Sequence, residues 1–326
     1  MKIIITQQIP KIAQEMLEKA GHQVEVLSQD GPPSREKLLE GVKGADAIVS
    51  VLTDKIDGEV MDAVGKQLKI IANYAVGYDN IDIEAAKQRN IAVTNTPGVL
   101  TEAVAEHTVA LMFAVAKRIA ESDKFMRDGK YKHWLPMGLA LNGVEGLGQQ
   151  LWGKTIGIVG LGRIGSFLAE ICFYGLKMKI IYHDVKRDDR FEMELKAEYH
   201  ELPTLLERSD VVSINVPLLD STRHLIGSKE LKMMKKTAIL INTSRGPVVD
   251  ENALVSALKE GEIRGAGLDV FENEPKLADG LKDLSNVVLT PHTASATLEA
   301  RITMATIVAK NIIEVLEGKE AINPVE

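Results

Sequence analysis

The stretch Thr155-Ile156-Gly157-Ile158-Val159-Gly160-Leu161-Gly162-Arg163-Ile164-Gly165 decides the fold of this chain. It begins as a short apolar run, which is typical of a strand buried in a parallel sheet. A turn with three glycines follows, and apolar residues at helical spacing continue from Phe167 to Phe173. The order of strand, glycine-rich turn and helix predicts one βαβ unit of a doubly wound α/β domain.

The three glycines of this turn have separate tasks in a phosphate-binding loop. Gly160 permits a tight turn, Gly162 lets a pyrophosphate approach the backbone, and Gly165 lets the helix pack closely on the strand. The free N–H groups at the start of the helix would then face the phosphates. The alternative interpretation is an ordinary glycine-rich turn, so the surrounding residues must decide between the two.

Asp184 favours the phosphate-binding interpretation, because it lies 19 residues after Gly165 at the end of a second apolar run. An acidic residue at this place hydrogen-bonds the ribose hydroxyls of a bound dinucleotide. Its charge would repel a 2′-phosphate, so we expect NAD as the cofactor and NADP to bind less well. Lys186 and Arg187 follow closely and would soften that preference.

Short β-branched runs alternate with helical patterns along both halves of the chain. In the first half the expected strands are Lys2–Thr6, Gln23–Val26, Asp46–Val51, Leu68–Asn73 and Ile91–Thr94. In the second half they are Thr155–Val159, Met178–Tyr182, Val211–Asn215, Thr237–Asn242, Gly265–Val270 and Val287–Thr290. Expected helices include Ile9–Ala20, Phe167–Leu176 and Glu251–Glu260. This alternation predicts two doubly wound parallel-sheet α/β domains of Rossmann or flavodoxin-like type.

Turn residues at Asn95-Thr96-Pro97-Gly98 mark the joint between the two series, before a helical pattern from Thr101 to about Ile119. The last helical pattern, Leu298–Leu316, has no following strand of its own series, so we expect it to return to the first domain. The first half also lacks a glycine-rich phosphate loop, so it should shape the substrate site. We therefore expect a discontinuous substrate-binding domain of residues 1–98 plus 294–326 and an NAD-binding domain of residues 99–293.

Composition excludes several classes of protein. The chain has 326 residues and a formal charge of −7, from 39 basic and 46 acidic side chains. This mild acidity argues against a nucleic-acid partner, and no apolar run reaches the roughly 18–20 residues that span a bilayer. Cys172 is the one cysteine, so neither an intramolecular disulfide nor a thiolate metal site can form. We expect a cytoplasmic protein with no metal and no membrane contact.

Three motifs with charged or ionisable side chains follow strands of the second series, at the edge where parallel sheets bind ligands. Arg245 follows the fourth strand, Glu272 and Glu274 follow the fifth, and His292 follows the sixth. A guanidinium in this position can bind a carboxylate through two hydrogen bonds and polarise an adjacent carbonyl. The alternative interpretation of Arg245 is a surface salt bridge.

His292 differs from the other histidines among the seven in the chain because it combines a strand-end position with such companions. A carboxylate beside a histidine holds one tautomer and stabilises the protonated ring. A protonated imidazole can donate to a carbonyl oxygen as hydride arrives at the carbonyl carbon. Arg245, Glu274 and His292 therefore suggest a carboxylate anchor, an orienting group and an acid, with a structural histidine as the alternative.

Together these motifs make the chain resemble the D-isomer-specific 2-hydroxyacid dehydrogenase family over nearly its whole length. The matching residues are Asn73–Asp82, Asn95–Pro97, Glu106–Thr108, Gly160–Gly165, Asn242–Arg245, Asp269–Pro275 and Thr290–Thr297. Residues 74–82 and 290–297 are most similar to the glyoxylate/hydroxypyruvate reductase branch. The resemblance implies that NADH reduces a small 2-oxo acid, glyoxylate or hydroxypyruvate before others, to the D-2-hydroxy acid.

The resemblance also implies the roles of single catalytic residues. Arg245 would bind the substrate carboxylate and His292 would donate the proton. Glu274 would orient His292, and it is chosen over Glu272 because the family's glutamate directly precedes proline. No motif marks the extra cationic site that a 3-phosphoglycerate dehydrogenase would need, and formate oxidation is disfavoured because that relative pairs histidine with glutamine.

Further binding residues come from the same resemblance. Backbone N–H groups of Val76 and Gly77, otherwise an ordinary turn, would bind the substrate carboxylate from the other domain. Together with Arg245 and His292 they would be the substrate-binding residues. The cofactor-binding residues would be Gly160, Gly162, Arg163, Ile164, Gly165, Asp184, Val216, Pro217, Thr222, Thr243, Asp269 and Ala294. Asp269 would touch the nicotinamide carboxamide.

One residue and one segment depart from the family pattern. Ala294 stands where many members have glycine, and Met137–Gln150, which we expect to be a loop, has no clear match. The segment borders the active site and the dimer contact of relatives, and Trp134 nearby would be a pocket wall or a packing residue. The resemblance implies a homodimer, and a rival function is a non-catalytic NADH-sensing partner protein, like the corepressor relatives.

Overall fold

The computed structural model describes residues 1–139 and 147–325, and it divides into two compact units. Unit 1 consists of Met1–Leu100 and Ala296–Glu326, and unit 2 consists of Thr101–Ser295. The expected boundaries between the domains, after residues 98 and 293, each lie two residues before the boundaries between these units. Across the described residues, no helix is both long enough and apolar enough to cross a membrane.

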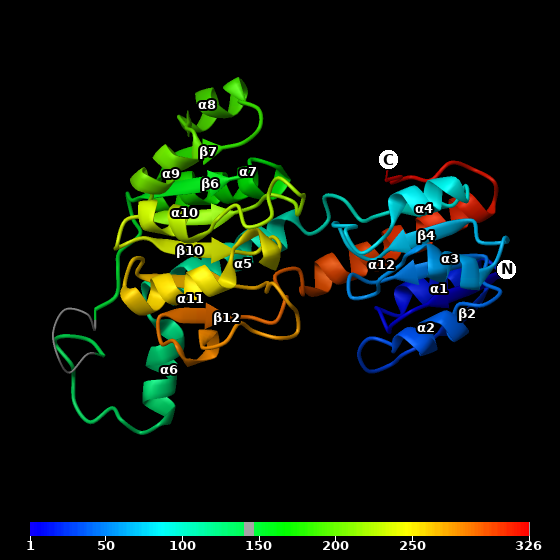
Figure 1. Ribbon diagram of the computed structural model, residues 1–326, viewed down its shortest axis with the longest axis horizontal. Coiled ribbons are helices and arrows are strands. Elements are labelled where there is room, and N and C mark those ends of the chain that lie inside the picture. The colour runs from blue at the N-terminus through cyan, green and yellow to red at the C-terminus, as the bar shows by residue number, and fades with distance from the viewer. Residues whose placement is uncertain (140–146, 326) are drawn as a thin grey trace. The chain divides into compact units, whose positions relative to one another are not determined.

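Unit 1 is built on a five-stranded parallel sheet in the order β2-β1-β3-β4-β5 (Figure 1). Its strands are β1 (Lys2–Ile5), β2 (Gln23–Val26), β3 (Ala47–Ser50), β4 (Ile70–Asn73) and β5 (Ala92–Thr94). The expected strands are all present, and four of them are one or two residues shorter than the apolar runs suggested. This strand order is the flavodoxin-like form of the doubly wound fold.

Helices cover both faces of this sheet, as a parallel sheet requires. They are α1 (Ile12–Lys19), α2 (Arg35–Gly41), α3 (Gly58–Val64), α4 (Ile83–Gln88) and α12 (Leu298–Leu316). Helices α1 and α12 share one apolar cluster with Ile3 and Ile5, while α2, α3 and α4 share the other with Ile4. The side chains of β1 therefore alternate between two cores, and α12 joins the sheet of the first hundred residues.

Unit 2 contains a seven-stranded parallel sheet in the order β12-β11-β10-β9-β6-β7-β8. Its strands are β6 (Thr155–Val159), β7 (Lys179–His183), β8 (Glu198–Tyr199), β9 (Val211–Ile214), β10 (Ile239–Asn242), β11 (Gly265–Leu268) and β12 (Val287–Leu289). The chain runs outward from β6 to β8, then returns to pair β9 with the other side of β6. Ligands bind at such a reversal, beyond the carboxyl ends of the strands. The fold class expected from the sequence is confirmed in both units.

The helices of unit 2 differ from the expectation at two places. They are α5 (Thr101–Ala116), α6 (Ile119–Arg127), α7 (Arg163–Glu170), α8 (Asp189–Leu195), α9 (Leu202–Arg208), α10 (Ser228–Met233) and α11 (Glu251–Glu260). The helix expected from Thr101 to about Ile119 is present as α5 but ends earlier, at Ala116, because Arg118 adopts a left-handed φ of 55° and α6 begins after it. The expected helix Phe167–Leu176 is present, but it begins earlier, at Arg163, and the part Ile171–Gly175 after α7 is π-helical.

The loop expected at Met137–Gln150 is only partly described. Residues 136–139 form a turn, residues 147–150 carry no helix or strand, and the segment 140–146 lies outside the described residues.

Candidate active site

The glycine-rich turn after β6 has the geometry that a phosphate-binding loop needs. Gly160 has a φ of +96°, and a Cβ atom there would lie 2.9 Å from the backbone nitrogen of Val216, which follows β9. A Cβ on Gly165 would lie 2.2 Å from the carbonyl oxygen of Gly160, so the helix can start this close to the strand only with glycine. Around Gly162 a Cβ would meet nothing within 4 Å, which leaves its outer side open.

This arrangement fits a dinucleotide. The open backbone at Gly162 lies directly before the first turn of α7, where N–H groups and the helix dipole favour a phosphate. Asp184, at the end of β7, accepts a hydrogen bond from the Leu161 N–H at 2.6 Å through one carboxylate oxygen. Its carboxylate is thus held beside the loop, where a ribose would be expected.

The remaining residues assigned to the cofactor lie on neighbouring loops of unit 2. Arg163 and Ile164 begin α7, and Val216 and Pro217 follow β9. The Thr222 hydroxyl donates to the Pro217 carbonyl oxygen at 2.7 Å, which closes the loop after β9. The Thr243 hydroxyl, beyond β10, lies 2.9 Å from that of Thr108 in α5.

Arg245 lies on a tight turn that the end of β10 holds in place. The Asn242 side chain donates to the Arg245 carbonyl oxygen at 3.0 Å and accepts from the Ser244 N–H at 3.0 Å. Arg245 is half-buried as a residue, and its guanidinium donates to the Ser244 carbonyl oxygen at 2.9 Å. Gly246 then packs on the chain at Phe271, where a Cβ would lie 1.9 Å from the carbonyl carbon. The Arg245 turn is therefore fixed against the loop that carries Glu274.

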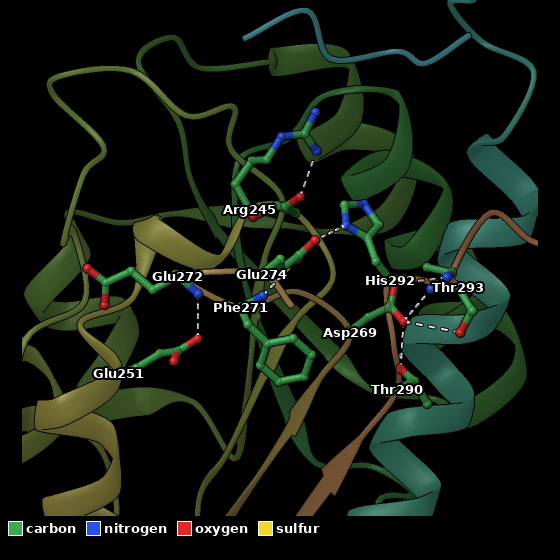
Figure 2. Close-up of polar contacts among 11 residues, drawn as sticks. Arg245, Glu251, Asp269, Phe271, Glu272, Glu274, Thr290, His292 and Thr293 are labelled. Carbon is green, nitrogen blue, oxygen red and sulfur yellow. Dashed lines mark hydrogen bonds and ion pairs between the residues drawn. The ribbon is translucent and has the colours of Figure 1, made fainter. Parts of the chain in front are cut away.

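His292 and Glu274 form a direct pair, with 2.9 Å between His292 Nδ1 and a Glu274 carboxylate oxygen. The other Glu274 oxygen accepts from the Phe271 N–H at 2.9 Å. Burial acts to raise the pKa of Glu274, but the hydrogen bonds from His292 and Phe271, with the charge of Arg245, outweigh it and hold that pKa below its ordinary value. Figure 2 shows the Arg245 and His292 side chains extending past Glu274 toward the same side.

Glu272, the other acidic candidate on this loop, has a different partner. Its carboxylate lies 2.6 Å from His224 Nε2. Of the two glutamates, Glu274 is the one that contacts His292 within the described part of the chain.

Asp269 is fully buried and holds the loop that carries His292 (Figure 2). It accepts hydrogen bonds from the Thr290 hydroxyl at 2.6 Å and from the N–H groups of Thr293 and Ala294, each at 2.8 Å. Burial acts to raise the pKa of Asp269, but the hydrogen bonds from His107, Thr290 and the two N–H groups outweigh it and hold that pKa below its ordinary value. These contacts give Asp269 a structural task in addition to the cofactor contact that the resemblance implies.

The backbone at His292 is strained. Its φ is 54°, in the left-handed region, and its N–H donates to the Asp269 carbonyl oxygen at 2.8 Å. A non-glycine residue with this conformation costs about 1 kcal/mol or more and is enriched at functional sites, where surrounding contacts impose it. Here the Asp269 contacts impose it, and the ring is thereby directed to Glu274.

Two residues that support the site, His107 and Glu251, were not among the expected site residues. His107, in α5, lies 3.0 Å from the Thr290 hydroxyl and 3.5 Å from an Asp269 oxygen. Glu251, which is 3% exposed, accepts from the Glu272 N–H at 2.6 Å (Figure 2) and from the Ala278 N–H at 3.2 Å. Glu251 thereby anchors both ends of the segment that carries Glu274, and burial raises its pKa. The Glu106-His107-Thr108 motif was the one signal in the sequence for either residue.

In unit 1, Val76 and Gly77 follow β4 in a half-buried loop. The Asn95 side chain, which follows β5, donates to the Val76 carbonyl oxygen at 2.7 Å. The Asn73 side chain donates to the Gly77 carbonyl oxygen at 2.8 Å. No hydrogen-bond acceptor contacts the N–H of Val76 or Gly77 among the residues that the structure describes.

The paired histidine and glutamate of unit 2, the adjacent arginine and the nucleotide loop are the parts that a nicotinamide-dependent oxidoreductase acting on a carbonyl group needs. The family model described as "D-isomer specific 2-hydroxyacid dehydrogenase, NAD binding domain" matches residues 109–294. The chain belongs to the D-isomer-specific 2-hydroxyacid dehydrogenase family.

Individual relatives agree with this assignment. A glyoxylate reductase from Thermococcus litoralis is 53% identical over 322 residues, which cover 98% of this chain and 94% of that protein. The crystal structure of the TT0316 protein from Thermus thermophilus matches with a TM-score of 0.92 and 42% identity, and all of both chains is covered. An NADPH-dependent glyoxylate/hydroxypyruvate reductase from Sinorhizobium meliloti has a TM-score of 0.83 and 32% identity, over 99% of this chain and 96% of that one.

Proposed function

We propose that this protein reduces a small 2-oxo acid, glyoxylate or hydroxypyruvate, to the D-2-hydroxy acid with NADH. The observation that carries the proposal is the 2.9 Å contact between His292 and Glu274 beside the half-buried Arg245. The relatives at about half identity that are glyoxylate reductases support the choice of substrate.

In this mechanism His292 is the acid. Its Nδ1 faces Glu274, so Nε2 is the nitrogen that can donate a proton to the substrate carbonyl oxygen. Glu274 keeps the ring oriented through its contact with Nδ1. Arg245 binds the substrate carboxylate, and the N–H groups of Val76 and Gly77 bind it as well. The bound nicotinamide supplies the hydride.

The cofactor would be NAD rather than NADP because the Asp184 carboxylate repels a 2′-phosphate. Its hydrogen bond from Leu161 keeps that charge beside the loop. Arg187 does not counter it readily, since its guanidinium is engaged by the Glu192 carboxylate at 2.7 Å. The NADPH-dependent relative shows that the family also uses NADPH, so an Asp184→Ser variant should gain NADPH activity relative to NADH.

A homodimer and a cytoplasmic location are part of the proposal. Helix α6 and the segment after it expose four large apolar side chains, Ile119, Met126, Tyr131 and Trp134. Apolar surface of this kind favours self-association. Light scattering of the purified protein should give twice the mass of the chain.

The proposal is tested by assaying a panel of 2-oxo acids with NADH and with NADPH. We expect glyoxylate and hydroxypyruvate to be reduced most efficiently, and NADH to be preferred. Preference for a phosphorylated substrate would favour a 3-phosphoglycerate dehydrogenase-type activity. Negligible turnover of every oxo acid, with capture of a specific protein by the NADH-bound form, would favour a corepressor-like sensor.

A further inference from the structure

In unit 1, the carbonyl groups of Ala75 and Val76 are both held by residues that follow β5. The Thr96 N–H donates to the Ala75 carbonyl oxygen at 2.9 Å. The Asn95 side-chain nitrogen donates to the Val76 carbonyl oxygen at 2.7 Å. Strands β4 and β5 are neighbours in the sheet, so the loops beyond their carboxyl ends lie side by side.

These two contacts also fix the direction of two N–H groups. A trans peptide unit is planar, so its C=O and N–H point in opposite directions. The Ala75 carbonyl belongs to the peptide of the Val76 N–H, and the Val76 carbonyl belongs to the peptide of the Gly77 N–H. Because both carbonyls face the adjacent residues Asn95 and Thr96, both N–H groups point away from them, toward the same side.

Two N–H groups on one side of a loop make a fork that suits the two oxygens of a carboxylate. The loop of Val76 and Gly77 is also held by Asn73, the last residue of β4. The Asn73 side chain donates to the Gly77 carbonyl oxygen at 2.8 Å, and Asn73 is itself fully buried and accepts from the Ser50 hydroxyl at 2.9 Å. The fork is therefore preorganised by the Thr96 backbone N–H and by the side-chain amides of Asn95 and Asn73.

We propose that Asn95 is a positioning residue that directs the Gly77 N–H to the same side as the Val76 N–H, which the Thr96 N–H fixes, and thereby favours substrates with a carboxylate beside the reacting carbonyl. Asn95 does not touch the substrate in this arrangement, because its amide acts through the Val76 carbonyl. The inference rests on the proposed function and deepens it. It holds that a side chain that contacts neither substrate nor cofactor contributes to the preference for carboxylate substrates.

The test compares glyoxylate with its methyl ester, which keeps the carbonyl but lacks the carboxylate charge. Asn95→Leu removes the amide donor with little change in size. We expect the KM for glyoxylate to rise about tenfold with kcat within about threefold, because a carboxylate contact is made in ground and transition states alike. Activity on the methyl ester should stay nearly constant, so the preference for glyoxylate over the ester falls about tenfold.

Asn323→Leu is the matched control. Asn323 is also half-buried, and its backbone oxygen accepts from the Asn95 N–H at 3.3 Å. Its side chain, however, accepts from Asn311 at 3.1 Å and contacts neither Val76 nor Gly77. This variant should lose a similar amount of stability without any change in the preference for glyoxylate over the ester.

Calorimetric binding of oxamate, an unreactive carboxylate analogue, in the presence of NADH gives a readout that needs no turnover. We expect oxamate affinity to fall about tenfold in Asn95→Leu and to stay unchanged in Asn323→Leu. Equal losses with glyoxylate and the ester, or unchanged oxamate affinity in Asn95→Leu, would overturn the inference while leaving the proposed function intact. A wild-type protein that binds oxamate but reduces no oxo acid would instead refute the proposed function alone.

Discussion

Gly246 lies so close to Phe271 that a Cβ atom on the glycine would be 1.9 Å from the Phe271 carbonyl carbon and 2.0 Å from its oxygen. Gly246 directly follows Arg245, and the Phe271 N–H donates to Glu274 at 2.9 Å. This single close approach therefore sets the distance between the turn that carries the guanidinium and the loop that carries the carboxylate.

The Gly246→Ala substitution should damage both stability and activity. The atom that the new methyl group meets is backbone, which cannot move aside as a side-chain tip can, so we expect a loss of about 3 kcal/mol in the free energy of unfolding. We also expect kcat to fall at least tenfold, since Arg245 and Glu274 are forced apart. Gly227→Ala is the control, because a Cβ there meets nothing closer than 3.5 Å. Urea unfolding of the two variants with equal midpoints would contradict this prediction.

Gly162 and Gly165 should respond differently to the same substitution. Gly162→Ala has room within the chain, so we expect its melting temperature to stay close to that of the wild type. Its new methyl group occupies the side that the pyrophosphate needs, so NADH affinity should fall at least tenfold. Gly165→Ala should lower the melting temperature even without NADH, because its Cβ would lie 2.2 Å from the Gly160 oxygen. Thermal scans and fluorescence titration with NADH measure both effects, and wild-type NADH affinity in Gly162→Ala would be the contrary result.

Asp269→Asn should remove stability in a manner that depends on pH. The Asp269 pKa is below its ordinary value in the folded protein, so the carboxylate stabilises the fold above about pH 4, and that contribution is lost as pH falls further. We expect Asp269→Asn to lower the free energy of unfolding by about 3 kcal/mol, since an amide cannot accept all of these hydrogen bonds. Denaturant unfolding should show a constant difference in the free energy of unfolding between variant and wild type from about pH 7 to about pH 5. Below about pH 4 this difference should become smaller. A stability difference that grows as pH falls would contradict this prediction.

Glu274→Gln should slow reduction at neutral pH. The hydrogen bonds from His292 and Phe271, with the charge of Arg245, hold the pKa of Glu274 below its ordinary value, so Glu274 is a carboxylate at neutral pH. An amide keeps the shape of this group but removes the charge beside His292 Nδ1, so we expect kcat for glyoxylate to fall by about tenfold or more. Steady-state reduction of glyoxylate at neutral pH measures this loss. A kcat within about threefold of wild type would show that the pair does not act in this way.

The parts of the fold that depend on local signals were predictable. Helix α11 begins and ends where the sequence indicated, because Asp250 caps it by accepting from the Ala253 N–H and Gly261 ends it with a left-handed φ of 69°. The glycines of the phosphate loop likewise act through local geometry. The break at Arg118 was not predictable, since apolar residues continue through it at helical spacing. Strand β8 was not predictable either, because its two residues, Glu198–Tyr199, are too few to form a recognisable pattern.

The candidate site was predictable in its residue types but not in its partners. The strand-end positions of Arg245, Glu274 and His292 follow from the alternation of strands and helices. The pairing of Glu272 with His224 and the burial of Asp269 depend on which loops pack together, and that information is tertiary. For the same reason the hydrogen bond from Asn95 to the Val76 carbonyl has no signature in the sequence.

His292→Ala gives the most direct test of the proposal that His292 supplies the proton to the substrate carbonyl. The proposal predicts that kcat for glyoxylate reduction at neutral pH falls by a factor of about 10² to 10⁴, the usual contribution of a general acid, while the dissociation constant of NADH stays within about twofold. Turnover within about threefold of wild type would show that another group protonates the substrate and would contradict the central assignment.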